Sequence, residues 1–177
     1  MRRLLALVLS TLMASACANA EASPETAGTD ATPDRVVGTS SLGTGDAAQE
    51  LPTLLVYKTS TCLCCQGWVE HMEAAGFTVD ARDVSAQDLM RVKMDGGIPS
   101  AMSSCHSAIV DGYMVEGHVP ADQIRRLLAE RPDVAGIGAP GMPMGSPGME
   151  GPNAKPYEVL SFTHDGQTAV FAIVDPR

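Results

Sequence analysis

Basic residues are scarce in this chain and form no cluster. Lysine and arginine together number 12, against 21 aspartates and glutamates, and the formal net charge is −9. Nucleic acids and anionic membrane surfaces attract basic patches, so neither is expected as a partner. The sequence also lacks a Ser/His/Asp arrangement, a phosphate loop, a nucleotide fingerprint and a paired-carboxylate motif. No motif therefore indicates a hydrolase or a nucleotide-dependent enzyme, and catalysis is not the first expectation.

A hydrophobic run long enough to cross a membrane is missing too. The apolar run from Leu4 to Ala16 is too short for that, but it follows Met1-Arg2-Arg3 and precedes small residues, which is typical of a secretory signal. The A-x-A pattern Ala18-Asn19-Ala20 predicts cleavage after Ala20, which makes residues 1–20 the signal peptide of an exported protein. The alternative is a lipoprotein cleavage that leaves Cys17 lipidated at the new N-terminus. The protein would then be an outer-membrane lipoprotein, with this lipid as its only membrane contact.

Large apolar side chains are almost absent from residues 21–50. Ala, Thr, Ser, Gly, Pro, Asp and Glu dominate there, and they cannot bury enough surface to offset the entropy lost on ordering. We therefore expect a disordered linker. From residue 51 to residue 177 the composition becomes that of a folded domain, long enough to hold one hydrophobic core.

The domain begins with alternating strands and helices. Apolar spacing predicts, in chain order, a strand, a helix, a strand and a helix over Leu54–Lys58, 64–75, 77–81 and 86–94. Asp111-Gly112 then predicts a hairpin, and Pro120 opens a third helix. This order is thioredoxin-like, so we predict an α/β fold with one thioredoxin-like domain. A second hairpin around Asp165-Gly166 adds a C-terminal extension to that fold.

Three cysteines lie within four residues, Cys62-Leu63-Cys64-Cys65, where the first strand should pass into the first helix. The unpaired N–H groups and the positive dipole end of a helix favour the thiolate there. Cys62 and Cys65 have the C-x-x-C spacing of redox disulfides, but Cys64 would compete for that bond. Three thiolates on one turn suit a soft cation instead, copper(I) ahead of zinc.

Cys105 is the candidate fourth sulfur ligand. It precedes a strand that should lie beside the first strand of this fold, which would bring it near the other thiols. His106, its neighbour, is a candidate imidazole ligand or hydrogen-bonding partner of the site. Two structural disulfides are the alternative for an exported protein, although adjacent Cys64 and Cys65 make that topology awkward.

Methionines and a further histidine complete the candidate ligands. Met142, Met144 and Met149 lie close together in a Gly/Pro-rich loop, and their thioethers suit copper(I). Alternatively, these side chains fill gaps where the loop packs on the domain. His118 follows the first predicted hairpin and is either a ligand or a hydrogen-bonded structural residue.

Seven short motifs occur in order along the domain. They are Val56-Tyr57-Lys58, Thr61-Cys62-x-Cys64-Cys65, Gly67-Trp68-Val69, Ser104-Cys105-His106, Val110-Asp111-Gly112-Tyr113, Glu116-Gly117-His118-Val119-Pro120 and the segment 140–149. Together they resemble the CopG-like copper-resistance family from about Leu54 to the C-terminus. Leu63 stands where that family commonly has glycine and Ser107 where threonine is common, and neither change removes a ligand.

The resemblance implies an exported thioredoxin-like protein that holds copper in a multinuclear copper(I)–thiolate cluster. It implies Cys62, Cys64, Cys65 and Cys105 as thiolate ligands, with His106, His118 and the methionine loop at further motif positions. We therefore predict a periplasmic copper(I)-binding protein of copper resistance or homeostasis. Its expected partners are copper ions and other periplasmic copper-handling proteins.

Two other functions remain open from the sequence. A thiol-disulfide or copper-linked oxidoreductase would use Cys62 and Cys65, and it should tolerate Cys64→Ser, whereas a three-thiolate site should not. A structural disulfide domain that serves as an interaction module would bind no metal and resist mild reductant.

Overall fold

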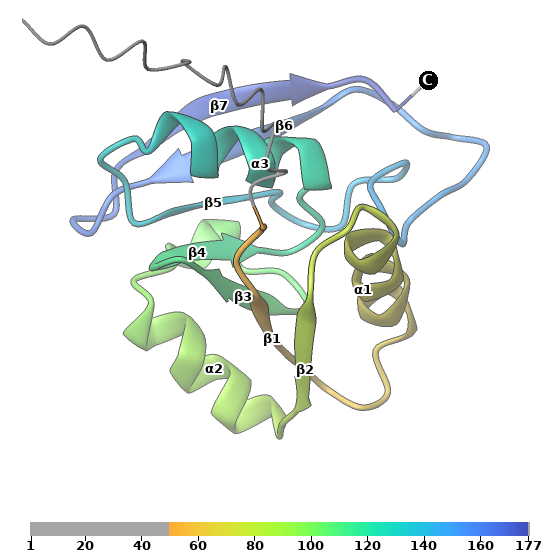
Figure 1. Cartoon of the computed structure of the whole chain (residues 1–177), viewed down its shortest axis with the longest axis horizontal. Coiled ribbons are helices and arrows are strands. Elements are labelled where there is room, and N and C mark those ends of the chain that lie inside the picture. The colour runs from red at the N-terminus through yellow and green to blue at the C-terminus, as the bar shows by residue number, and fades with distance from the viewer. Residues whose placement is uncertain (1–49, 177) are drawn as a thin grey trace, which may run out of the picture. The chain divides into compact units, whose positions relative to one another are not determined.

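The computed structural model of the protein describes residues 50–176 (Figure 1). The predicted signal peptide, Cys17 and all but the last residue of the predicted linker lie outside this range. The elements, in chain order, are β1 (Leu54–Lys58), α1 (Leu63–Ala74), β2 (Val79–Asp83), α2 (Ala86–Asp95), a short 3-10 helix η1 (Ser100–Met102), β3 (Ser107–Val110), β4 (Tyr113–Glu116), α3 (Ala121–Glu130), β5 (Gly136–Gly138), β6 (Tyr157–Phe162) and β7 (Thr168–Val174). Within residues 50–176, no helix has the length and apolarity needed to cross a membrane. The predicted α/β class is confirmed.

All seven strands join one sheet in the order β2-β1-β3-β4-β5-β6-β7. β1 pairs with β2 in parallel and with β3 antiparallel, and β3 pairs with β4 antiparallel. These four strands come from the predicted strand-helix-strand-helix-hairpin order, and the name thioredoxin-like stays a prediction for them. The predicted C-terminal hairpin, β6 and β7, continues the same sheet through β5.

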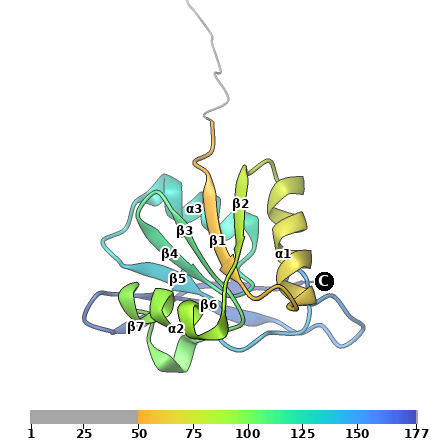
Figure 2. The same cartoon turned by 90° about the horizontal axis from the view of Figure 1, so that it is seen from below.

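Helices cover both faces of the sheet, α1 and α3 on one and α2 on the other (Figures 1 and 2). Trp68 of α1 and Ile124 of α3 join one core cluster with Val56 and Val115 of the sheet. The α2 face has a smaller cluster of buried residues, namely Met102, Met114, Ala135 and Phe162. Burial on both faces explains why β1 reads as a nearly continuous apolar run.

The hairpin between β3 and β4 forms at Asp111 and Gly112, as predicted. Both residues have positive φ, +48° and +86°, which is the geometry of the favoured two-residue hairpin turn. Arg131, just after α3, also has a positive φ, +50°, and its guanidinium forms an ion pair with the Asp111 carboxylate. This ion pair links the turn to the end of α3.

β5 is a strand that the sequence analysis does not predict. It is only Gly136-Ile137-Gly138, fully buried and parallel to β4. A Cβ at Gly136 would overlap the Met114 carbonyl oxygen, and one at Gly138 would lie 2.9 Å from Met102 Cε. The close approach of the two backbones therefore requires glycine at Gly136, whereas the atom met at Gly138 is the end of a flexible side chain. The two glycines remove the side-chain pattern that reveals most strands.

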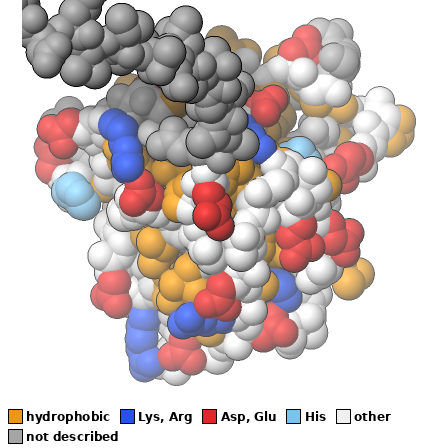
Figure 3. Space-filling view, in the orientation of Figure 1, with side chains coloured by type: hydrophobic (Ala, Val, Ile, Leu, Met, Phe, Trp, Pro, Cys, Tyr) orange, Lys and Arg blue, Asp and Glu red, His pale blue; other side chains and the backbone are white. Residues whose placement is uncertain are grey.

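The described surface carries mostly negative charge. On the face shown in Figure 3, Asp and Glu side chains are scattered among fewer Lys and Arg side chains. This agrees with the formal charge of the sequence, −9. Asp80 and Asp83 of the edge strand β2 are exposed, but each forms an ion pair, with Arg82 and Lys58 respectively, and so adds no net charge.

Candidate metal centre

The start of α1 places the cysteine turn at the edge of the core. Cys62 precedes the helix with an extended backbone, and its carbonyl accepts a hydrogen bond from the Gln66 N–H at 3.2 Å. Its side chain makes no capping hydrogen bond, and the first turn carries no acidic residue. The positive end of the helix is therefore left to the thiols. Leu63 points outward, with 86% of its surface exposed, whereas Cys65 is fully buried.

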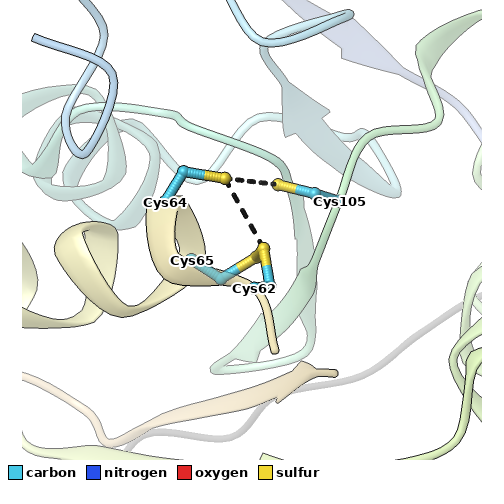
Figure 4. A group of neighbouring side chains, drawn as sticks. All are labelled: Cys62, Cys64, Cys65 and Cys105. Atoms are coloured by element: carbon cyan, nitrogen blue, oxygen red, sulfur yellow. Dashed lines mark hydrogen bonds between the residues drawn. A yellow bond between two sulfur atoms is a disulfide. The ribbon is translucent and has the colours of Figure 1, made fainter. Parts of the chain in front are cut away.

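The four predicted thiolate ligands lie in one group. The sulfurs of Cys62, Cys64, Cys65 and Cys105 all lie within 4.8 Å of one another. Cys62 and Cys65 form a disulfide, and Cys64 and Cys105 are free thiols. Cys64 Sγ lies 3.5 Å from Cys62 Sγ of the disulfide and 3.9 Å from the free thiol of Cys105 (Figure 4). The two cysteines with C-x-x-C spacing thus form a disulfide, and the described residues contain no second one.

Cys105 also belongs to a second group, with His106 and His118, whose candidate ligand atoms lie within 4.8 Å of one another. His118 Nε2 is 3.0 Å from Cys105 Sγ, and His118 Nδ1 is 2.8 Å from the Pro147 carbonyl oxygen. A carbonyl only accepts, so Nδ1 carries the proton and Nε2 presents its lone pair to the cysteine. His118 is fully buried, two residues after the end of β4.

His106 is fully buried between the cysteine group and the core. Its Nδ1 lies 3.5 Å from Cys105 Sγ, and its ring packs against Trp68 and His118, with centroids 4.5 Å and 5.0 Å away. His106 Nε2 has no hydrogen-bond partner among the described residues. The nitrogen beside the cysteine is Nδ1, so Nδ1 is the candidate ligand atom, and the buried Nε2 is left without a hydrogen bond at a cost to stability.

Burial keeps this group of residues uncharged in the metal-free protein. It raises the pKa of Cys105 to about 11, with the neighbouring Cys64 adding to the effect. Burial also lowers the pKa of His106 well below its usual value, helped by His118, Lys93 and Lys58. The pKa of His118 is lowered by burial as well, and the bond to Pro147 opposes that shift. A bound cation would therefore displace a proton from Cys105.

The methionine loop, residues 139–156, covers the first turn of α1. Gly148 packs against that turn so closely that a Cβ on it would overlap the Cys64 carbonyl oxygen, and a Cβ on Gly67 would lie 3.0 Å from Gly148 Cα. Met142 and Met144 are 51% and 43% exposed, and Met149 is half-buried. The loop packs on the domain through Gly148, but Met142 and Met144 are exposed and fill no gap there, so the alternative reading fails for these two side chains. The part of the thioethers in metal binding stays a prediction.

Sequence reasoning missed a buried ion pair behind Cys105. Lys93 of α2 and Glu116 of β4 form it, with side chains 6% and 0% exposed. Glu116 was visible only as part of a quoted motif. Lys93 carried no signal, because a lysine in a helix is normally a surface residue.

The donor set determines which metals suit the centre. Its two groups offer four sulfurs and two imidazoles, and no carboxylate belongs to either. Hard cations such as magnesium and calcium prefer oxygen ligands, whereas thiolates and imidazoles favour copper(I) and zinc. The residues present therefore fit a soft metal ion, provided that the Cys62–Cys65 disulfide is reduced first.

Comparison with known proteins agrees with this assignment. Two solved structures, described as copper resistance protein CopG in forms 1 and 2, are 42% and 44% identical in sequence to this chain. Each alignment covers 71% of this chain and 98% or 99% of the other, with a TM-score of 0.65. Residues 102–149 match a family described as a protein of unknown function, DUF411. A search of curated proteins gives no match.

Proposed function

This chain belongs to the CopG-like copper resistance family, and from that premise we propose that it binds copper(I) through its cysteine group in the periplasm. The observation that carries the proposal is the convergence of four sulfurs within 4.8 Å, three from one turn of α1 and the fourth from the loop before β3. Because the four sulfurs lie so close together, each thiolate can bridge two copper ions. We therefore propose a multinuclear copper(I)–thiolate cluster. Its role is to hold copper under copper stress and to pass it on.

Binding requires the reduced protein. The Cys62–Cys65 disulfide removes two of the four thiolates, so the disulfide form offers Cys64 and Cys105 as its free thiols. Reduction adds two electrons and two protons and releases the two further ligands. The copper capacity of the protein should therefore follow the oxidation state of this pair.

The neighbouring side chains have supporting roles in this proposal. His118 and His106 supply imidazole nitrogens beside Cys105, at the inner end of the sulfur group. Exposed Met142 and Met144 offer thioethers on the outer surface, where a periplasmic copper-handling partner can reach them. Periplasmic location rests on the signal-type N-terminus, and the mass of the mature N-terminus will distinguish a cut before Glu21 from a lipid on Cys17.

The test is an anaerobic copper(I) titration of the reduced mature protein. We expect more than one copper per chain and protection of all four cysteines of the domain from thiol reagents. Serine at Cys62, Cys64, Cys65 or Cys105 should lower the stoichiometry or affinity in every case. Met90→Leu is the control, because it removes a sulfur from α2 on the opposite face of the sheet. Unchanged binding in all four serine variants would overturn the proposal.

A thiol-disulfide oxidoreductase is the second candidate, and the Cys62–Cys65 disulfide is the observation that favours it. Such an enzyme cycles these two sulfurs between dithiol and disulfide, and the partner protein takes or gives the two electrons and two protons. Cys64→Ser separates the candidates. Retained disulfide exchange with lost copper binding would show that the two functions use different sulfurs of the same turn.

A further inference from the structure

We propose that Glu116 and Lys93 are positioning residues for Cys105, holding its thiol next to Cys64 and His118. Three of the four sulfurs are placed by one helical turn, and Cys105 alone comes from another segment. It lies between η1 and β3, where regular secondary structure does not fix the backbone. Side-chain hydrogen bonds to its neighbours in the chain therefore have a large share in setting its position. The consequence for copper rests on the proposed function, whereas the positioning itself does not.

The Glu116 carboxylate binds the Cys105 loop on both sides of the cysteine. Its Oε1 accepts a hydrogen bond from the Ser104 N–H at 2.5 Å, and its Oε2 accepts one from the Ser107 hydroxyl at 2.6 Å. Bonds to an ionised acceptor are the stronger kind. One carboxylate thus fixes the residue before Cys105 and the second residue after it.

Lys93 fixes the remaining part of the same loop from α2. Its Nζ donates to Glu116 Oε1, to the Ser107 hydroxyl at 3.0 Å and, at 3.5 Å, to the His106 carbonyl oxygen. The ammonium also compensates the buried Glu116 charge, which would otherwise be too costly to keep. The pair therefore connects α2, β4 and the cysteine loop.

Glu116 and His118 are also linked through the backbone, because only Gly117 separates them in the chain. β4 ends at Glu116, and Gly117 donates its N–H to the His106 carbonyl at 3.1 Å before the chain reaches His118. Gly117 has a φ of +68°, and a Cβ there would lie 2.6 Å from Ser104 Cβ. The loop and the strand end are thus pressed together at this point. The carboxylate holds the cysteine loop against the same strand end that carries the histidine.

Stability alone is a poor explanation for this pair. A buried ion pair often contributes little to folding, and well-packed apolar residues of similar volume frequently replace it without loss. What apolar residues cannot supply are bonds to the Ser104 N–H, the Ser107 hydroxyl and the His106 carbonyl. The pair is suited to orienting these polar groups, and with them the thiol between them.

The test measures the geometry of Cys105 without any metal. In the metal-free mature protein with its Cys62–Cys65 disulfide, a short bifunctional thiol reagent links Cys64 to Cys105, whose sulfurs lie 3.9 Å apart. We expect Glu116→Ala to slow this linkage about tenfold, since small displacements cost large factors in reactions between positioned groups. Glu116→Gln keeps an acceptor for the Ser104 N–H and should rescue the rate to within about threefold of the wild type.

Controls separate positioning from loss of stability. Ile124→Val removes a methylene from a fully buried residue of α3, which makes none of these contacts, and its linkage rate should equal the wild-type rate. If Glu116→Ala does not fold, Lys93→Met takes its place, with slower linkage than Ile124→Val expected. Wild-type linkage rates in the Glu116 and Lys93 variants would overturn the proposal.

Copper binding is measured separately on the same reduced variants. Glu116→Ala should weaken copper(I) binding and change the copper–thiolate absorption, and Ile124→Val should not. If the wild type itself binds no copper, the proposed function fails while the linkage rates still decide the positioning role. If copper binds normally and the rates are unchanged, only the positioning role fails.

Discussion

Cys105 Sγ lies 3.0 Å from His118 Nε2, and the other nitrogen of that ring is 2.8 Å from the Pro147 carbonyl oxygen. One histidine therefore joins two segments that are distant in sequence, the cysteine loop and the methionine loop. Because Nδ1 is held by a carbonyl, the ring is fixed as the tautomer that leaves Nε2 free. His118 Nε2 can accept a hydrogen bond from the Cys105 thiol or bind a cation, and both are consistent with a site that is neutral when empty.

The metal-free protein should lose stability as the pH falls below about 6.5, the ordinary pKa of histidine. Folding favours the neutral rings of His106 and His118, since burial lowers the pKa of both. Their contribution to the free energy of unfolding is therefore complete above the histidine pKa of the unfolded chain. It is lost as the pH drops toward the lowered pKa values of the two residues in the folded protein. Urea unfolding at a series of pH values between about 7.5 and 5 will measure this.

His118→Gln should flatten that pH dependence, and His164→Gln is its matched control. His164 is exposed at the turn between β6 and β7, so its replacement should leave the curve unchanged. If stability fell with pH as steeply in both His118→Gln and His106→Gln as in the wild type, the pH dependence would not come from these two histidines.

Alkylation of Cys105 should be slow at pH 8 and keep accelerating toward pH 11. The thiolate is the reactive form, and burial raises the pKa of Cys105 to about 11. Folding thus favours the protonated thiol, so this group also costs stability as the pH rises from the ordinary thiol value toward 11. Peptide mass spectrometry after timed iodoacetamide treatment reports the rate. Cys64 is an internal comparison of similar exposure. A Cys105 rate that levels off near pH 8 would show that the thiol is not shielded.

Gly148→Ala should destabilise the protein more than Gly141→Ala, although both glycines have a positive φ. At Gly141, a Cβ meets nothing within 4 Å, so only the backbone strain of about 1 kcal/mol applies. At Gly148, the methyl group would also overlap the Cys64 carbonyl oxygen and push the loop off α1. We expect a loss of about 3 kcal/mol there, and faster labelling of Cys64. Equal unfolding free energies for the two variants would mean that the loop is not tightly packed.

Gly136→Ala should release the C-terminal hairpin from the sheet. A Cβ at this position of β5 overlaps the Met114 carbonyl oxygen, and the backbone of β4 cannot move without breaking its own pairing. Hydrogen exchange should show β6 and β7 losing protection while β1 and β3 keep theirs. Gly112→Ala, with positive φ but open space around it, should leave the protection of β6 unchanged. Uniform loss of protection in all strands would mean that the hairpin and the rest of the sheet unfold as one unit.

The sequence predicted the elements whose signals are local. Asp111-Gly112 gave the hairpin turn, and three cysteines within four residues had to share one turn. The second strand was expected over residues 77–81 and lies at Val79–Asp83, since alternation alone does not fix where pairing begins. The nearness of Cys105 followed from the expected strand neighbours, because β3 does pair with β1.

Other features depend on contacts that no local pattern contains. The orphaned Nε2 of His106 and the pair of Lys93 with Glu116 exist only once α2, β4 and the cysteine loop are packed together. Which two of the four cysteines form the disulfide is likewise decided by geometry, although the C-x-x-C spacing favoured Cys62 and Cys65. β5 was hidden because close packing there demands glycine.

The cover over the cysteine turn is a connection between two strands, β5 and β6, and not a free tail. Both ends of that connection are already fixed by the sheet before the loop touches α1. A segment closed in this way has given up part of its conformational freedom in advance, so docking it costs less entropy than docking a free segment of equal length. By fixing one end of this glycine- and proline-rich loop, the short strand β5 lowers the conformational entropy lost when the loop docks on the first turn of α1.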